Sequence, residues 1–472
     1  MQKVKEAAQA ILNWAKKGSF FLIISHFDAD GLASAGIIGK ALARLDVPFH
    51  LRIVDHLDEE LLEEIKNTEH DVLIFTEIGS GYLDLIQGKL GDRSEIIVID
   101  HHQPLLKAPS KIVHLNPHLY GFDGSREIAG SGVVYLVVKE IDNKNVDLSI
   151  LAIVGALGDM QDKCDKRSLC GLNDLIAQEG VREGYLKISV DLIFYGRETR
   201  PLHKALAYTT NPFLPGLSGE EDKCLALLTS SGINLKNGER WRTISDLSLE
   251  EKQSLLAKII EFSSASGFPG KKALDLVGTV YTLEKEEETI PTRDAREYAS
   301  VLNACGRMNK TGLAVSLCLG DRTSSLQEAQ QVLTDYRKTL AKYIRFLAEN
   351  PSYVQEMERI YAVRGEDWLD ENMTGALASM LSSSGIANED KVMLVLAKSK
   401  ESLMKISARA NEAMLSKGLN LGEVLQGLVK NYEGVGGGHD IAAGANIPIE
   451  FIDKFLEDLN SSLRKILGDQ NV

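Results

Sequence analysis

The chain has 472 residues, of which 44% are hydrophobic and 25% are charged, and its formal net charge is −14. This length exceeds what one hydrophobic core supports, so we expect two or three domains. The composition is that of a globular protein, and the acidic balance argues against a protein that coats nucleic acid over its whole surface. A locally positive channel, or a site where bound cations supply positive charge, remains compatible with it.

Residues 1–18 have the spacing of an amphipathic helix, without the apolar block and cleavage site of a signal peptide. No apolar run approaches the length of a membrane span. The five cysteines form no CxxC pair, so we expect reduced structural thiols, including Cys164 and Cys170, rather than disulfides or metal ligands. Together these features predict a cytoplasmic protein with no membrane association.

The N-terminal part alternates apolar strands with helical segments. Its first strand, Phe20–Ile24, runs into a loop that carries His26, Asp28 and Asp30. Further strands are expected at 49–54, 71–76, 95–99 and 113–116. Strands that alternate with helices imply right-handed crossovers and a parallel sheet. The polar residues that follow these strands should therefore meet at the carboxyl edge, where open α/β sheets bind ligands.

Two further segments of this part place small or acidic residues at helix ends. Gly130 to Gly132 open an apolar helix, a plausible start for anion binding. The apolar stretch 148–157 is followed by Asp159. We expect a parallel-sheet domain over 1–200.

The remainder is expected to contain a bridge and a second α/β domain. Periodicity weakens after residue 200, so we expect a mostly helical insert or bridge over 201–270. A second α/β domain is expected over 271–472. Its predicted elements are strands at 276–283, 391–397 and 403–409 and helices at 293–304 and 325–349.

Carboxylates and imidazoles follow several of the predicted segments: His26, Asp28, Asp30, Glu77, Asp100, His101, His102 and Asp159. Acidic residues between a strand and a helix often only cap the helix, and this interpretation stays open. An EF-hand is disfavoured because the further oxygen ligands and the closing Glu are missing. Mixed imidazole and carboxylate ligands suit manganese or zinc, and the carboxylate excess favours manganese or magnesium. Two such ions can promote phosphoester hydrolysis.

Four motifs carry a family resemblance: His26 to Gly31, Asp100 to His102, Gly158-Asp159, and Gly436 to His439 with Ala443-Gly444. Together they resemble the DHH phosphoesterase superfamily of the RecJ-like exonuclease type. The last motif is similar to the DHH-associated domain. The resemblance implies a DHH domain over 1–200, a DHH-associated nucleic-acid-binding domain over 271–472 and a catalytic cleft between them.

The resemblance also implies roles for single residues around two divalent cations, manganese above all, with magnesium or zinc as alternatives. The implied ligands are His26 and Asp28 for one ion, Asp30, His101 and Asp159 for the other, and residue 77 as a bridge. Asp100 would orient the neighbouring imidazoles. His102 would contact the scissile phosphate or assist proton transfer.

Glu77 departs from the family pattern, which usually places Asp at the bridging position. The extra methylene moves the carboxylate by roughly 1 to 1.5 Å, which is large against metal-ligand distances of about 2.0 to 2.2 Å. A tolerated ligand, a natural weakening of activity and an engineered change all remain open. We expect metal binding to be retained.

The C-terminal part is expected to grip nucleic acid. From Lys391 to Lys430 there are seven Lys or Arg against three Glu. The resemblance suggests these phosphate-binding candidates: Arg307, Ser407, Arg409, Gly436, Gly437, Gly438 and His439. A solvated helix face and a plain tight turn are the alternatives for the basic stretch and the glycine loop.

The resemblance implies a manganese-dependent exonuclease that degrades single-stranded DNA from 5′ to 3′, with RNA possible, and releases mononucleotides. It also implies action in DNA replication or repair with the GINS complex and the replicative helicase assembly. The alternative is a catalytically weakened or inactive helicase-accessory scaffold of the same superfamily that binds GINS and DNA.

Overall fold

The computed structural model describes residues 2–91, 95–104, 109, 111–209, 211–265, 270–383, 390–399 and 402–468. The chain divides into two compact units. Unit 1 comprises the described residues of 1–209 and 215–333, and unit 2 comprises those of 210–214 and 334–472. Residues 271–333, which the sequence analysis groups with the C-terminal domain, pack within unit 1. The division into three domains stays a prediction.

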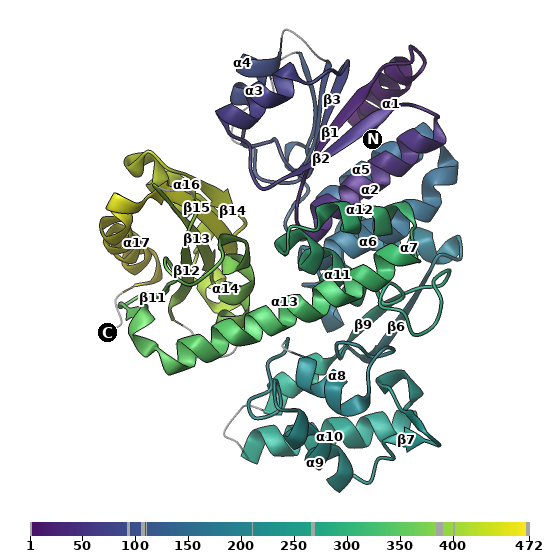
Figure 1. Ribbon diagram of the computed structural model, residues 1–472, viewed down its shortest axis with the longest axis vertical. Helices are drawn as coiled ribbons and strands as arrows, with labels where there is room; N and C mark the ends of the chain where they lie inside the picture. The colour runs from purple at the N-terminus through teal and green to yellow at the C-terminus, as the bar shows by residue number, and fades with distance from the viewer. Residues whose placement is uncertain are drawn as a thin grey trace. The chain divides into compact units, whose positions relative to one another are not determined.

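Unit 1 contains a five-stranded parallel sheet with the order β2-β1-β3-β4-β5, which lies at the top of Figure 1. Its strands are β1 (Phe21–His26), β2 (Phe49–Val54), β3 (Val72–Thr76), β4 (Glu95–Ile99) and β5 (Ile112–Leu115). The predicted parallel sheet is confirmed. The chain changes direction across the sheet between β1 and β3, and ligands bind at the carboxyl edge of such a switch point.

Helices cover both faces of this sheet, which explains why its strands are nearly all apolar. One face, with Leu22, Leu73 and Val98, packs against α3 (Glu59–Asn67) and α4 (Leu83–Leu90). The other face is covered by α1 (Gln2–Ala15), α2 (Ala29–Arg44) and α5 (Gly130–Ile141). Helix α6 (Ser149–Gly158) packs on α2 and α5.

The rest of unit 1 is organised by an antiparallel pair, β6 (Leu186–Leu192) and β9 (Val277–Leu283). The strand expected at 276–283 exists, and it packs within unit 1 rather than with the strands of unit 2. Its partner β6 escaped the sequence analysis because Ser189 and Asp191 interrupt its apolar pattern. The other elements of this part are α7 (Gly171–Arg182), α8 (Leu202–Tyr208), α9 (Glu221–Ser230), β7 (Lys236–Asn237), β8 (Arg240–Trp241), α10 (Leu249–Ala265), α11 (Ala295–Arg307) and α12 (Thr311–Leu319).

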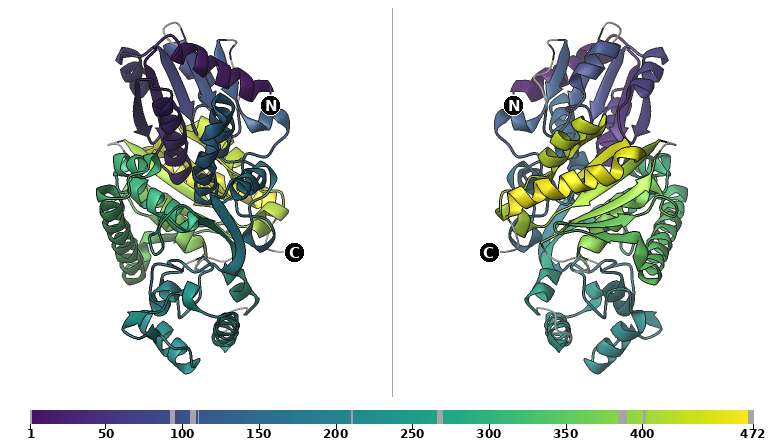
Figure 2. Two further views of the ribbon diagram at one scale, coloured as in Figure 1. Left: turned by 90° about the vertical axis from the view of Figure 1, so that its right-hand side faces the viewer. Right: turned by 90° about the vertical axis from the view of Figure 1, so that its left-hand side faces the viewer.

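Unit 2 contains a six-stranded mixed sheet with the order β10-β11-β12-β13-β15-β14. Its strands are β10 (Val354–Glu356), β11 (Ile360–Arg364), β12 (Val392–Lys398), β13 (Leu403–Arg409), β14 (Val435–Gly438) and β15 (Ala442–Pro448). One face packs against α16 (Leu421–Val429) and α17 (Ile452–Leu467), beside α15 (Glu412–Ser416). Helix α14 (Thr374–Ser383) and the second half of α13 (Ser324–Glu349) cover the other face (Figure 2).

The expectation of reduced thiols is wrong for one pair, because Cys164 and Cys170 form a disulfide. A short turn around Lys166 brings their Cα atoms to 6.1 Å, within disulfide range. Counting cysteines cannot detect such local geometry. Cys224, Cys305 and Cys318 are free and buried. Within the described ranges, no helix combines the length and the apolar character needed to cross a membrane.

Truncating the central sheet should destabilise the protein far more than an equal change at the surface. Leu73 on β3 is fully buried, so Leu73→Ala should lower the free energy of unfolding by about 2–5 kcal/mol. Leu175 on α7 is 62% exposed, and Leu175→Ala should change it by less than about 0.5 kcal/mol. Urea denaturation followed by circular dichroism measures both, and equal losses would contradict this core assignment.

Candidate metal centre

The loop between β1 and α2 carries Asp28 in two roles. As the N-cap of α2, Asp28 accepts a hydrogen bond from the Gly31 amide through Oδ1, at 2.9 Å. Its Oδ2 lies 3.0 Å from His26 Nδ1. The capping interpretation is therefore correct for one oxygen, while the other oxygen faces the histidine that ends β1.

Asp30, in the first turn of α2, is bound by the start of another helix. The amides of Gly130 and Ser131 at the N-terminus of α5 donate to its two carboxylate oxygens, at 2.7 and 3.0 Å. The predicted anion-binding helix start thus holds an internal carboxylate. Gly155 of α6 packs against the same group, because a β-carbon there would lie 2.3 Å from Asp30 Oδ1.

Glu77 follows β3 with a left-handed backbone, φ 60°, which is strained for a residue other than glycine. Its amide donates to the carbonyl of Ile99, so the pairing with β4 continues through this residue. The side chain is only 2% exposed. A β-carbon at Gly130 would lie 2.7 Å from Glu77 Cγ, so the glycine makes room for the glutamate.

The motif Asp100-His101-His102 follows β4 and is fixed by hydrogen bonds. Asp100 accepts from the Ser80 amide at 2.8 Å and from His102 Nδ1 at 2.9 Å. His101 Nδ1 donates to the Gly124 carbonyl at 2.6 Å. Each ring therefore turns Nε2 toward Glu77 Oε1, at 3.3 Å for His101 and 3.7 Å for His102. Such fixed tautomers are typical of metal-binding histidines.

Within unit 1, the possible ligand atoms form two groups that share Glu77. In each group, the possible ligand atoms lie within 4.8 Å of one another; one group is His26, Asp28 and Glu77, and the other is Asp30, Glu77 and His101. Asp159, which follows α6, lies beside the second group, with Oδ2 4.0 Å from His101 Nδ1. The structure thus brings together all eight residues selected from the N-terminal part of the sequence.

Buried negative charge dominates the electrostatics of this cluster. Burial raises the pKa of Glu77 well above its usual range, and the charge of Asp28 acts in the same direction. Burial also raises the pKa of Asp30, to about 6, and that of Asp159, although His101 opposes both shifts.

For two histidines and two other carboxylates, the surroundings instead favour the charged form. Burial disfavours the charged form of His26, but the charges of Asp28 and Glu77 outweigh it and raise the His26 pKa to about 9. Burial likewise opposes protonation of His102, and Asp100 outweighs it, so this pKa also rises to about 9. The pKa values of Asp28 and Asp100 are lowered despite their burial, mainly by His26 and His102 respectively.

These residues fit divalent cations. Glu77 Oε2 is buried and has no hydrogen-bond partner in the part of the chain that the structure describes. A cation would compensate this oxygen, and it would offset the burial and the mutual repulsion that raise the pKa values of Glu77, Asp30 and Asp159. The donors are imidazole nitrogens and a majority of carboxylate oxygens, with no thiolate among them. Manganese and magnesium prefer such oxygen-rich sites.

Several positioning residues were missed by the sequence analysis because they are uncharged and lie far apart in the chain. Asn116 donates to Ser80 Oγ and to the His102 carbonyl, each at 2.8 Å. Gln161 donates to Asp159 at 2.8 Å. Asn303 of α11 accepts from the Ala29 amide at 3.0 Å. The available signal was position, because Asn116 ends one predicted apolar segment and Gln161 closely follows another.

Arg307 lies in unit 1, at the end of α11, and not in the C-terminal unit where the sequence analysis placed it. The preceding Gly306 packs on the loop between β1 and α2, since a β-carbon there would lie 1.9 Å from the Phe27 carbonyl oxygen. The arginine is therefore carried by a helix that contacts this loop.

The other phosphate-binding candidates lie in unit 2. Ser407 on β13 is buried, and its hydroxyl lies 2.9 Å from that of Thr374 at the start of α14. Arg409 donates to Ser379 Oγ at 2.8 Å and to the Gly375 carbonyl at 3.3 Å. Gly436 to Gly438 form part of β14 rather than a loop, and His439 follows them in the turn to β15.

Family models match three parts of the chain. The DHH family N-terminal domain matches residues 21–157, the DHH-CID domain matches 194–277 and the DHHA1 domain matches 358–465. An uncharacterized protein of Methanocaldococcus jannaschii is 32% identical over 480 residues, which cover 100% of this chain and 99% of that protein. The chain therefore belongs to the DHH family, and its fold is RecJ-like.

Exonucleases and a CDC45 protein resemble this chain at lower sequence identity. The single-stranded-DNA-specific exonuclease RecJ of Thermus thermophilus is 26% identical over 247 residues, so the match spans 48% of this chain but only 35% of RecJ. Its crystal structure with Mn²⁺ has a TM-score of 0.59 at 18% identity, covering 98% of this chain and 55% of RecJ. CDC45 from Entamoeba histolytica has a TM-score of 0.64 at 15% identity, covering 98% of this chain and 99% of CDC45.

Asp30→Asn should remove part of the pH dependence of stability in EDTA. The folded state raises the pKa of Asp30 from 3.8 to about 6. This carboxyl therefore contributes stability below about pH 4, and the contribution is lost as the pH rises through about 6. The free energy of unfolding should fall more steeply over this window in the unchanged protein than in the variant, as measured by urea denaturation.

The matched control is Asp84→Asn, which changes an exposed carboxylate on α4. Its pH profile should follow that of the unchanged protein. If the Asp30→Asn profile also ran parallel to that of the unchanged protein, the inferred electrostatic strain at Asp30 would be wrong.

Proposed function

We propose that the chain is a divalent-cation-dependent exonuclease that hydrolyses phosphodiester bonds of single-stranded nucleic acid. The observation that carries this proposal is the position of Glu77, whose carboxylate belongs to both candidate ligand groups. One shared carboxylate between two groups of donors is what a pair of neighbouring ions requires. The RecJ relatives support the substrate class, because they are described as acting on single-stranded DNA.

The proposed ligands of one ion are His26, Asp28 and Glu77, and those of the other are Asp30, His101, Asp159 and the shared Glu77. Bound divalent cations would supply the charge that activates water and offsets the negative phosphate. Manganese is our first choice because the donors mix imidazole with a carboxylate majority, and magnesium or zinc are alternatives. The α5 amides and Gln161 hold Asp30 and Asp159 in orientation.

His102 is the proposed proton donor or phosphate contact. Its Nδ1 is held by Asp100, so Nε2 points toward Glu77. Burial opposes protonation of His102, but Asp100 outweighs it and raises the pKa to about 9 in the protein without metal, so the ring is suited to donate a hydrogen bond or a proton to an oxygen of the reacting phosphate. Asp100 acts as a positioning residue because it holds the ring.

The proposed substrate is DNA degraded from 5′ to 3′ to mononucleotides, with RNA possible. Arg307, Ser407, Arg409, Gly436 to Gly438 and His439 are the proposed contacts to phosphate. We further propose a cytoplasmic role in DNA replication or repair, with the GINS complex and the replicative helicase assembly as partners.

A second candidate is an accessory scaffold of the same superfamily that has lost much of its activity and binds GINS and DNA. Glu77 favours it, because the family usually has the shorter Asp at this position. The likeness to CDC45 over nearly its whole length is compatible with it. The other ligand positions argue against it, since they carry side chains that bind metals.

Glu77→Gln and Asp28→Asn should each lower nuclease activity at least about 100-fold, because each removes a charged ligand. Activity is measured with Mn²⁺ on single strands labelled at the 5′ or the 3′ end. Asp84→Asn is the matched control and should retain full activity. Isothermal titration with Mn²⁺ should show weaker binding for the first two variants only.

Glu77→Asp separates the two candidate functions. If Glu77 works as the bridge, the unchanged protein is active without this substitution. Inactivity of the unchanged protein with recovery in Glu77→Asp would assign the defect to the bridge. Equal inactivity of both would remove the nuclease proposal and leave the scaffold.

Arg409→Ala should weaken single-strand binding. It should also reduce the slope of log binding constant against log salt concentration by the equivalent of about one phosphate contact, while the Mn²⁺ affinity stays unchanged. Arg345→Ala, an exposed arginine on α13, is the matched control and should change neither. Fluorescence anisotropy at several salt concentrations measures the slope. Circular dichroism checks folding, because Arg409 also links β13 to α14. Loss of Mn²⁺ binding instead would show that the role of Arg409 is misassigned.

A further inference from the structure

A cavity in unit 1 lies away from the candidate metal centre, at the other ends of α2 and α6. It has a volume of about 430 Å³, which is in the range of small-molecule sites. Lys40 lines it from α2, ten residues after Asp30, or about 15 Å along the helix. Leu148 and Leu151 line it from the start of α6, whereas Asp159 follows the end of that helix.

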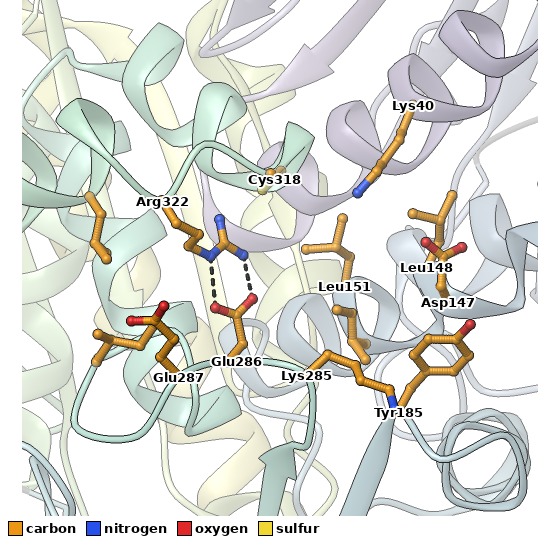
Figure 3. A pocket seen from close by; sticks show the side chains of 14 residues that line it. Lys40, Asp147, Leu148, Leu151, Tyr185, Lys285, Glu286, Glu287, Cys318 and Arg322 are labelled. Carbon is orange, nitrogen blue, oxygen red and sulfur yellow. Dashed lines mark hydrogen bonds and ion pairs between the residues drawn. The ribbon is translucent and has the colours of Figure 1, made fainter.

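Lys40 brings an uncompensated charge into this cavity. Its side chain is partly buried and points into the cavity (Figure 3). The ammonium group makes neither a hydrogen bond nor an ion pair with any residue that the structure describes. Burial lowers the pKa of Lys40, and Asp147 opposes this shift only in part. A partly buried cation without a partner is costly, and a bound anion would remove that cost.

The carboxylates around the cavity do not provide this partner. Asp147 is held by Arg44 at 2.5 Å. Glu286 is held by both arms of the Arg322 guanidinium, at 2.6 and 2.8 Å, as Figure 3 shows. Glu287 is exposed at the rim, where Lys285 provides another positive charge.

The rest of the lining is suited to an uncharged body attached to the anion. Leu148, Leu151 and Leu326 are buried apolar side chains, and Ile290 is partly buried. Tyr185 adds an aromatic ring with a hydroxyl group, and the ammonium of Lys285 lies 6.0 Å from the centre of this ring. Apolar walls with a few polar groups are typical of sites for small organic molecules.

We infer that this cavity binds a small organic anion, with its phosphate or carboxylate group at Lys40 and its apolar body against Leu148, Leu151 and Leu326. The site is separate from the metal centre and does not depend on the proposed nuclease activity. It lies at the opposite ends of α2 and α6 from that centre. Its binding can therefore be measured in protein from which metal has been removed.

Isothermal titration in EDTA tests this inference with deoxythymidine 5′-monophosphate, benzoate and uncharged deoxythymidine as probes. At least one of the two anions should bind, and deoxythymidine should bind at least tenfold more weakly than its monophosphate if phosphate is the preferred group. The anion that binds more tightly shows whether the cavity prefers a phosphate or a carboxylate group.

Lys40→Met keeps the apolar stem and removes the charge, so it should weaken binding of that anion at least tenfold. Ile290→Trp fills the cavity from its partly buried side and should abolish binding even if Lys40→Met folds poorly. Lys5→Met, an exposed lysine on α1, and Arg345→Ala, an exposed arginine in unit 2, are controls that should leave binding unchanged. No binding of either anion, or equal binding by Lys40→Met and the unchanged protein, would overturn the inference.

Discussion

The burial of neighbouring carboxylates, together with their mutual repulsion, at the carboxyl edge of β1, β3 and β4 is the constraint on which the rest of unit 1 depends. Asp30, Glu77 and Asp159 are held close together, and the fold raises the pKa of each. Such an arrangement costs stability unless positive charge is present. The α5 amides at Asp30 and the neighbouring histidines supply part of this charge, and we attribute the remainder to divalent cations.

The backbone around Glu77 is adapted to this constraint. A left-handed φ at a non-glycine residue costs about 1–3 kcal/mol and persists only where surrounding structure imposes it. Here the pairing with Ile99 on one side and the absence of a side chain at Gly130 on the other fix the carboxylate. The longer glutamate is therefore accommodated by the local packing, which favours retained metal binding over a decayed site.

The sequence was sufficient for the parallel sheet because β1, β3 and β4 are uninterrupted apolar runs followed by polar residues. A strand buried on both faces leaves this signal regardless of its partners. The pairing of β6 with β9 could not be predicted, since polar residues interrupt β6 and nothing local specifies its partner. The disulfide between Cys164 and Cys170 depends on a turn geometry that spacing alone does not show.

Of the candidate site, the sequence likewise indicated one part and missed another. Candidate ligands such as Asp28 and His101 could be found because they follow strands, and parallel strands bring them to one edge. The groups that orient them could not, because amides such as Gly130 and side chains such as Asn303 act through contacts between distant segments. The place of Arg307 in unit 1 likewise depends on how α11 packs.

The central claim is that Glu77 joins two cation sites, and anomalous scattering from crystals soaked in Mn²⁺ tests it most directly. Our account predicts two peaks, each within about 2.0–2.6 Å of a carboxylate oxygen of Glu77, one beside His26 and Asp28 and the other beside Asp30 and His101. A single peak without Glu77 as a ligand, or no peak in this cluster, would contradict it.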